Sequence, residues 1–220
     1  MKKFIMILFI GLLIIINGEI LKAQEPPVQC LPGEVQLTKY VTINVNGTNC
    51  QYKIILCVEC PAGTGQAQFK IRLKSYVPYP INCGFTDDTQ VRDKIWAMIY
   101  SPNWITLNIA TDCFAGWGPC PENAQHLTCI TPKCWTKVGY WDDEQIWRVI
   151  RVACDSDPNC VCKYEKVICW NPQTQDFDIQ TTADEDNYLQ CCPENTIPDD
   201  PEEGNTTPTG CYYLACPVVE

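Results

Sequence analysis

The sequence holds few of the side chains on which nucleophilic catalysis and nucleic-acid binding depend. It contains one histidine, His126, and three serines, Ser75, Ser101 and Ser156. No Gly-x-Ser-x-Gly elbow is present, and a serine or cysteine hydrolase needs a nucleophile, a base and an orienting group close together. The formal net charge is −10 without a basic cluster, which argues against nucleic acids and anionic membranes as partners.

Long hydrophobic runs are also lacking. The longest covers residues 4–16, which is short of the roughly 20 residues that a membrane-spanning helix needs. It follows Lys2 and Lys3 and precedes Ala23, the order of basic, apolar and small residues that is typical of a secretory signal peptide. We therefore expect residues 1–23 to be removed on export. The mature protein should be secreted or held in the cell envelope, without a membrane span.

Cysteine, in contrast, is abundant, with 17 residues in the chain. Disulfides persist in oxidising compartments, so this content agrees with export. Because 17 is odd, at least one cysteine has no partner within its own chain. Two alternatives follow, a free thiol or a bond between two chains, and the second predicts a disulfide-linked or self-assembled oligomer.

The first hairpin is predicted around Asn46-Gly47, because a tight turn of this composition between β-branched runs is a strong hairpin signal. A loop of two or of four residues assigns the same side chains to each face. The expected core face comprises Val41, Ile43, Val45, Cys50, Tyr52, Ile54, Leu56, Val58 and Cys60. The opposite face comprises Lys53, Ile55, Cys57 and Glu59.

Three cysteines make the second arm of this hairpin a structural hub. In a regular strand Cys50 and Cys60 lie about 33 Å apart, beyond disulfide reach, and Cys57 points to the opposite face. Each sulfur is therefore expected to bond outside the strand. The same Cys-x-Tyr-x4-Cys pattern recurs from Cys162 to Cys169, either as an internal repeat or through the shared chemistry of cysteine-rich strands.

The rest of the chain predicts further strands and one helix. Residues 69–73 alternate apolar and charged side chains, as in a strand with one exposed face. Thr86 or Asp87 caps a helix over about 87–100, which Ser101-Pro102 ends. Residues 104–109 are expected to be a strand, and residues 113–134 a loop held by disulfides.

Two more hairpins are predicted, one over residues 135–154 with its turn at 142–145 and one from residue 160 through a turn at Asn171-Pro172. The fold class is therefore mainly β, a disulfide-rich antiparallel β-sandwich or curved sheet with one covering α-helix.

Three regions follow the signal peptide. Residues 24–192 form the disulfide-rich β domain, and residues 193–210 form a flexible, acidic, proline-rich linker. Residues 211–220 form a cysteine-containing tail. This tail either docks on the domain or reaches toward another chain.

Aromatic residues of the 135–154 hairpin provide the main binding hypothesis. With a four-residue loop, Tyr140 and Trp147 pair across the strands, beside a Val138–Val149 pair. Trp135 and Trp141 then face the opposite side, together with Ile146 and Ile150. Aromatic residues on both faces indicate either that both faces are covered or that Trp135, Trp141, Tyr140 and Trp147 supply a platform for sugar rings or a protein partner. Core packing is the commoner role of such residues.

Metal and redox sites have little support. Cys57-Val-Glu-Cys60 has the spacing of a redox motif but ends a strand rather than beginning a helix. No second Cys-x-x-Cys completes a zinc site, and His126 near Cys129 is typical of an ordinary loop histidine. Residues 155–159 imitate the start of a calcium loop, but Cys160 replaces its glycine. We expect no cofactor and no metal.

Paired carboxylates are the remaining enzymatic route, because glycoside hydrolysis needs only two of them facing each other across a cleft. Asp142, Asp143 and Glu144 lie in a predicted turn, and Asp176 and Asp178 in a predicted strand. The sequence places no two of them across a cleft.

The expected function is that of a non-enzymatic extracellular or envelope protein, with a structural, adhesion or binding role. Its partner is expected to be a protein or a glycan. A secreted inhibitor or effector and a carboxylate-based secreted hydrolase are the alternatives.

Overall fold

The computed structural model describes residues 25–60, 68–80, 83–84, 87–109, 117–154, 160–184 and 191–217. The predicted signal peptide, the calcium-like segment 155–159 and the alternative helix cap Thr86 lie outside the described residues. The described part of the chain is mainly β, with one open sheet and two helices. The fold class predicted from the sequence is therefore confirmed as a disulfide-rich curved sheet.

The described residues form nine strands. These are β1 Glu34–Val45, β2 Thr48–Glu59, β3 Gln68–Pro78, β4 Gln125–Pro132, β5 Cys134–Trp141, β6 Trp147–Ala153, β7 Val161–Asn171, β8 Asp176–Asp184 and β9 Tyr212–Tyr213. Helices α2 Asp88–Ile99 and α3 Pro102–Asn108 follow β3 in the chain.

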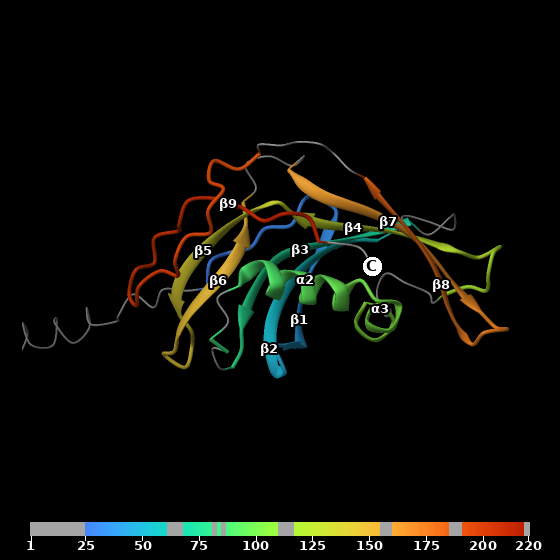
Figure 1. Ribbon diagram of the computed structural model, residues 1–220, viewed down its shortest axis with the longest axis horizontal. Helices are drawn as coiled ribbons and strands as arrows, with labels where there is room; N and C mark the ends of the chain where they lie inside the picture. Colours follow the sequence, from blue (N-terminus) through green and yellow to red (C-terminus); the bar gives the residue numbers. More distant parts are fainter. Residues whose placement is uncertain are drawn as a thin grey trace, which may run out of the picture.

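The sheet divides into two arms at β3. One edge of β3 pairs with β2, which pairs with β1. The other edge pairs in parallel with β4 from Gln68 to Arg72, and then with β6 at Ser75 and Tyr76. One arm continues as β4, β7 and β8, and the other as β6, β5 and β9. Figure 1 shows the arms on the right and left of β1, β2 and β3.

The first hairpin has the register that its turn predicts. Val45 pairs with Thr48, so the loop contains only Asn46 and Gly47, whose φ angles are 50° and 83°. All the side chains that were assigned to the core face on β1 and from Cys50 to Val58 on β2 are buried. They pack beneath α2 and α3, which cover the same side of the sheet in Figure 1.

Helix α2 is also confirmed. The Asp87 side chain accepts a hydrogen bond from the Gln90 amide at 3.0 Å, which satisfies one of the free N–H groups of the first turn. Val91, Ile95 and Ile99 recur at helical spacing and are buried against the sheet.

Two further elements correct the sequence-based predictions. Residues 104–109 do not form a strand, because Ser101 caps a second helix, α3, by accepting from the Trp104 amide, and Pro102 occupies its first turn. Part of the predicted 113–134 loop is a strand, β4, which lies between β3 and β7. The parallel β3–β4 pair also makes the sheet mixed rather than purely antiparallel.

The second hairpin has a five-residue loop instead of the predicted four. Asp142 Oδ1 accepts hydrogen bonds from the amides of Glu144 and Ile146, at 2.9 and 2.8 Å, which stabilise the longer loop. Trp141 therefore pairs with Trp147, and Val138 with Ile150. The predicted pairing of Tyr140 with Trp147 is wrong, because Arg148 is the residue opposite Tyr140. Ile150 packs with Tyr140 and Val138, and not with Trp135 and Trp141.

Seven disulfides join described residues. They are Cys30–Cys57, Cys50–Cys83, Cys120–Cys169, Cys134–Cys192, Cys154–Cys211, Cys160–Cys191 and Cys162–Cys216. Cys60 is disulfide-bonded as well. In β2 and β7, Cys50, Cys57, Cys162 and Cys169 all bond to partners outside their own strands.

The C-terminal segment docks on the β domain. Cys211 and Cys216 are both paired within the chain, with Cys154 and Cys162. Residues 193–210, predicted to be a flexible linker, lie along β5 and β6. The Thr209 amide donates to the Lys137 carbonyl at 2.9 Å, and Asp200 accepts from Arg151 at 2.8 Å. Figure 1 shows this segment beside β5.

No helix in the described part of the chain has the length and apolar character needed to cross a membrane.

Candidate functional site

The four aromatic residues of the predicted platform lie in different environments. Trp135 is 0% exposed, packs against Tyr76 and donates from its indole N–H to the Pro132 carbonyl at 2.8 Å. Tyr140 is also buried. Trp135 therefore cannot present its ring to a ligand. Trp141 and Trp147 are partly exposed and form an edge-to-face pair with ring centroids 5.4 Å apart.

Trp141 and Tyr140 border a surface groove of about 870 Å³, which we call the aromatic groove. Besides apolar and polar residues, it is lined by four aromatic rings and four carboxylates. The rings are those of Tyr40, Tyr79, Tyr140 and Trp141. The carboxylates are those of Glu25, Asp142, Asp143 and Glu144.

The alternation of the first hairpin explains why the groove lies where it does. Gln36, Thr38 and Tyr40 on β1 point away from the core face, as do Lys53 and Ile55 on β2, and these side chains form the floor of the groove. The segment that begins at Glu25 forms one wall. It is held there by an ion pair between Glu25 and Lys53 and by the Cys30–Cys57 disulfide. The hairpin loop after Trp141 supplies the acidic side.

Two of the rings that line the groove lie close together. Tyr40 is 49% exposed, and its ring centroid lies 5.3 Å from that of Tyr79. The buried guanidinium group of Arg148 lies 5.5 Å from the Tyr79 ring centroid, so the aromatic site already accommodates one cation. Burial raises the pKa of the Tyr140 hydroxyl, with a further contribution from Glu25, so this group stays protonated at neutral pH.

The carboxylates of the hairpin loop differ in their roles. Burial raises the pKa of Asp142, but hydrogen bonds from the Ile146 amide and from Arg148 Nε, the latter at 2.8 Å, outweigh it and leave the pKa below its usual value. Asp142 is therefore ionised, and its carboxylate accepts hydrogen bonds from the loop amides and from Arg148. Asp143 and Glu144 are exposed and form no ion pair with any described residue.

The structure separates the five carboxylates that the sequence singled out. Asp142, Asp143 and Glu144 line the aromatic groove, whereas Asp176 and Asp178 lie on β8 in the other arm. Asp178 accepts a hydrogen bond from Asn171 at 3.0 Å. A general acid needs a raised pKa, and Asp142 has the opposite shift.

A second group of charges is buried beneath the C-terminal segment. Asp88 contacts Arg151 Nε at 2.9 Å and Lys137 Nζ at 3.1 Å, and the Tyr212 hydroxyl donates to it at 3.2 Å. Asp200, on the segment, contacts the same two cations at 2.8 Å. Because all these residues except Asp200 are buried, we assign the group to structure: it joins helix α2, the β5–β6 hairpin and the C-terminal segment.

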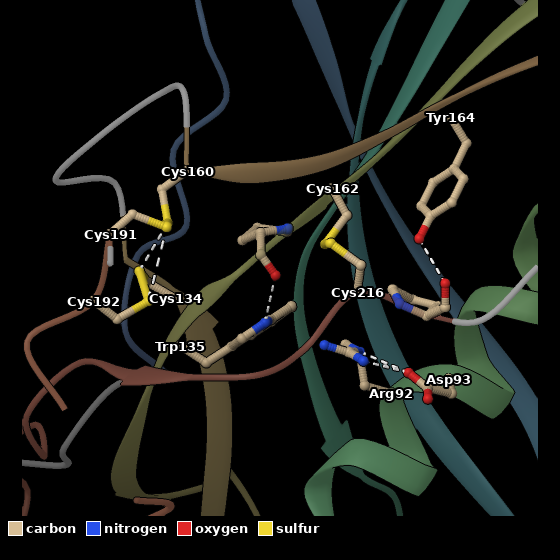
Figure 2. Close-up of a disulfide and its surroundings, with 12 residues drawn as sticks. Arg92, Asp93, Cys134, Trp135, Cys160, Cys162, Tyr164, Cys191, Cys192 and Cys216 are labelled. Atoms are coloured by element: carbon tan, nitrogen blue, oxygen red, sulfur yellow. Dashed lines mark hydrogen bonds and ion pairs between the residues drawn. A yellow bond between two sulfur atoms is a disulfide. The ribbon is translucent and has the colours of Figure 1, made fainter. Parts of the chain in front are cut away.

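Two cysteine features of possible chemical interest also have structural explanations. Cys129, the one free cysteine among the described residues, is buried, and burial raises the pKa of its thiol. His126 lies three residues before Cys129 on β4, so its side chain points to the opposite face of the strand from the thiol. Figure 2 shows Cys134, Cys160, Cys191 and Cys192 in two adjacent disulfides. Their four sulfur atoms all lie within 4.8 Å of one another. Oxidised sulfurs do not supply the thiolates that a metal site of this kind requires.

Sequence reasoning found Tyr140, Trp141 and the acidic loop, but missed Tyr40, Tyr79 and Glu25. These three lie far from the hairpin in the chain and reach the groove only through sheet pairing and the Cys30–Cys57 bond. The exposure of Tyr40 followed from the alternation of β1 and was the one available signal.

Comparison of the chain with models of known protein families, with curated proteins and with solved structures gives no match.

Proposed function

We propose that the protein is an exported, non-enzymatic binding module that holds an oligosaccharide in the aromatic groove. The observation that carries this proposal is the combination, in one groove, of the exposed Tyr40 ring and the partly exposed Tyr79 and Trp141 rings with carboxylates and polar strand side chains. The apolar C–H faces of a sugar pack on aromatic rings. Its hydroxyl groups donate hydrogen bonds to ionised carboxylates, which are strong acceptors.

Export is supported by two observations. The disulfides are too numerous for a reducing compartment, and residues 1–23 have the order of a signal peptide. A crosslinked sheet that holds its ligand-binding rings on strands and short loops also suits an extracellular or envelope binding protein. Binding is favoured over hydrolysis because Asp142, the most enclosed of the loop carboxylates, is occupied by Arg148 and the loop amides.

The test is a panel of immobilised oligosaccharides. We expect selective binding to members of the panel, and about tenfold weaker binding by Tyr40→Ala, which removes the most exposed ring of the groove. Trp170→Ala is the matched control, because this partly exposed ring lies on β7, away from the groove. Absence of binding to every member, or an equal loss in the control, would contradict the proposal.

A basic protein segment is the second candidate ligand, in line with a secreted inhibitor or effector. Asp143 and Glu144 favour it, because their charges are exposed and unpaired among the described residues. A lysine-rich peptide that binds where the oligosaccharides fail, with an affinity that falls steeply as salt is added, would select this candidate.

A further inference from the structure

The edge of β1 has fewer of the features that protect a sheet edge from pairing with another chain than the other edges of the described sheet. The two other edge strands of the described sheet are better protected, because β9 is only two residues long and β8 carries the exposed carboxylates of Asp176 and Asp178. In contrast, β1 has 12 residues, contains no proline and pairs with β2 without a register shift. Its only charged residues are Glu34 and Lys39.

The turn of the first hairpin determines which backbone groups of β1 face outward. A two-residue loop makes Val45 and Thr48 a hydrogen-bonded pair, and such pairs then alternate along the strands. The even-numbered residues of β1, from 34 to 44, therefore direct their N–H and C=O groups away from β2. The bond from the Tyr79 amide to the Gln51 carbonyl fits this pattern, because Gln51 lies opposite Thr42 and its carbonyl faces away from β1.

This edge is accessible. The side chains of the outward-facing residues from Gln36 to Asn44 are all exposed. The Glu34 amide donates to the Leu31 carbonyl at 3.0 Å, but from Gln36 to Asn44 no described backbone group pairs with that edge. The edge thus offers a row of donors and acceptors that another strand of the same spacing can satisfy.

We propose that β1 pairs in antiparallel orientation with β1 of a second copy of this chain. In a two-fold symmetric pair, outward-facing residues lie opposite outward-facing residues, so the axis passes near Thr38, Lys39 or Tyr40. An axis at Lys39 places two like charges opposite each other, which is unfavourable. An axis at Thr38 recruits Glu34, whose carboxylate already binds Arg72 and the Leu31 amide.

The axis at Tyr40 is the best of the three. It places Tyr40 opposite Tyr40 of the second copy, Thr38 opposite Thr42 of the second copy, and Gln36 opposite Asn44 of the second copy. Aromatic pairs and threonine pairs are among the favourable cross-strand neighbours, and no like charges meet. The sheets of the two copies become one continuous sheet with β1 in its interior.

This arrangement brings the two aromatic grooves together. The side chains of Gln36, Thr38 and Tyr40 line the aromatic groove, and the backbone groups of the same residues pair with the second copy. The two grooves therefore adjoin across the axis. The Tyr40 ring of each copy then borders the groove of the other. A ligand with several repeated units can occupy both grooves, which raises its overall affinity without a new contact within either copy.

Sedimentation velocity over a concentration series tests the dimer without any ligand. We expect the wild-type protein to dimerise reversibly. The double variants Thr38→Lys/Thr42→Lys and Thr38→Glu/Thr42→Glu are each expected to raise the dissociation constant about tenfold, because like charges then face each other at two symmetric positions. An equimolar mixture of the two variants should restore the dimer, because each lysine then faces a glutamate.

The matched control is Gln180→Lys/Thr182→Lys, which changes two exposed residues on the β8 edge and should leave the dimer unchanged. The inference is overturned if the wild-type protein stays monomeric throughout the series. It is equally overturned if the β1 variants dimerise as the wild type does, or if mixing them restores nothing.

Discussion

Asp88 is the residue on which the packing of the C-terminal segment depends most. Its carboxylate is buried between Lys137 and Arg151, at 3.1 and 2.9 Å, and also accepts a hydrogen bond from Tyr212. Asp200 completes the group from the surface, with a side chain 44% exposed. Asp88 is therefore the only buried counterion among the described contacts of these two cations, while Asp200 is half exposed to solvent.

Replacement of Asp88 by asparagine should be far more destabilising than the same change at Asp200. Asp88→Asn leaves two buried cations with one half-exposed counterion, at a cost of about 3 to 5 kcal/mol in the free energy of unfolding. Asp200→Asn should cost about 1 kcal/mol, because solvent screens that pair. Urea denaturation of both variants measures the difference, and equal effects would contradict the assigned roles.

The Asp200 contacts also predict a loss of stability in acid. Burial raises the pKa of Asp200, but Arg151 and Lys137 outweigh it and lower the pKa below its usual value. Its stabilising contribution is therefore complete above about pH 4 and disappears as the pH falls through the lower pKa of the folded state. The free energy of unfolding of the wild type minus that of Asp200→Asn should shrink over this acidic interval. A difference that stays constant with pH would contradict the prediction.

Cys129 should be an inert thiol in the folded protein. It is 0% exposed, so a reagent cannot reach its sulfur atom. Burial also raises the pKa of its thiol, so the reactive thiolate is not formed at neutral pH. Alkylation without reduction, followed by mass spectrometry, should leave Cys129 unmodified in the native protein and label it after denaturation. Rapid labelling of the native protein would show that this part of the core opens.

At the scale of elements, the sequence predicted those with strong local signals. The Asn46-Gly47 turn and strand alternation determine the first hairpin, and Asp87 with its periodic apolar residues determines α2. Helix α3 was missed because Ser101-Pro102 both ends one helix and begins the next. Strand β4 was missed because residues 127–132 are buried on both faces, which removes the alternation of polar and apolar side chains.

The second hairpin shows how one residue of loop length changes a site. Asp142 holds a five-residue loop, and this shifts every pair of β5 and β6 by one position relative to a four-residue loop. The candidate platform changed accordingly: Trp141 meets Trp147, while Trp135 belongs to the core. The side-chain hydrogen bonds that select the loop depend on three-dimensional geometry, so a strand pattern does not reveal them.

Gly139 should be essential to the Trp141–Trp147 pair. A Cβ atom at this position would lie 2.1 Å from the Trp147 ring and 2.8 Å from the Asn205 carbonyl. Gly139→Ala therefore forces the ring and the C-terminal segment apart, at an expected cost of about 1 to 3 kcal/mol. Near-ultraviolet circular dichroism should lose the signal of the coupled tryptophans. An unchanged spectrum and an unchanged free energy of unfolding would show that the Trp147 ring does not pack against Gly139.

At the scale of the whole molecule, disulfides and the C-terminal segment connect the two arms of the sheet. Cys154, which follows β6, bonds to Cys211, and Cys162 on β7 bonds to Cys216, so one short tail is attached to both arms. Figure 2 shows the second of these bonds, with Tyr164 donating a hydrogen bond to the end of the described tail nearby. Cysteine content predicted such crosslinking, but connectivity depends on sheet order, which includes the non-local β3–β4 pair.

We propose that the aromatic groove of this crosslinked sheet binds an oligosaccharide. The most direct test is a calorimetric titration with an oligosaccharide selected from the panel, for the wild type and for Trp141→Ala. We expect a dissociation constant about tenfold higher for the variant, at unchanged far-ultraviolet circular dichroism, because one stacking ring of the groove is lost. A variant that binds with the affinity of the wild type would contradict it.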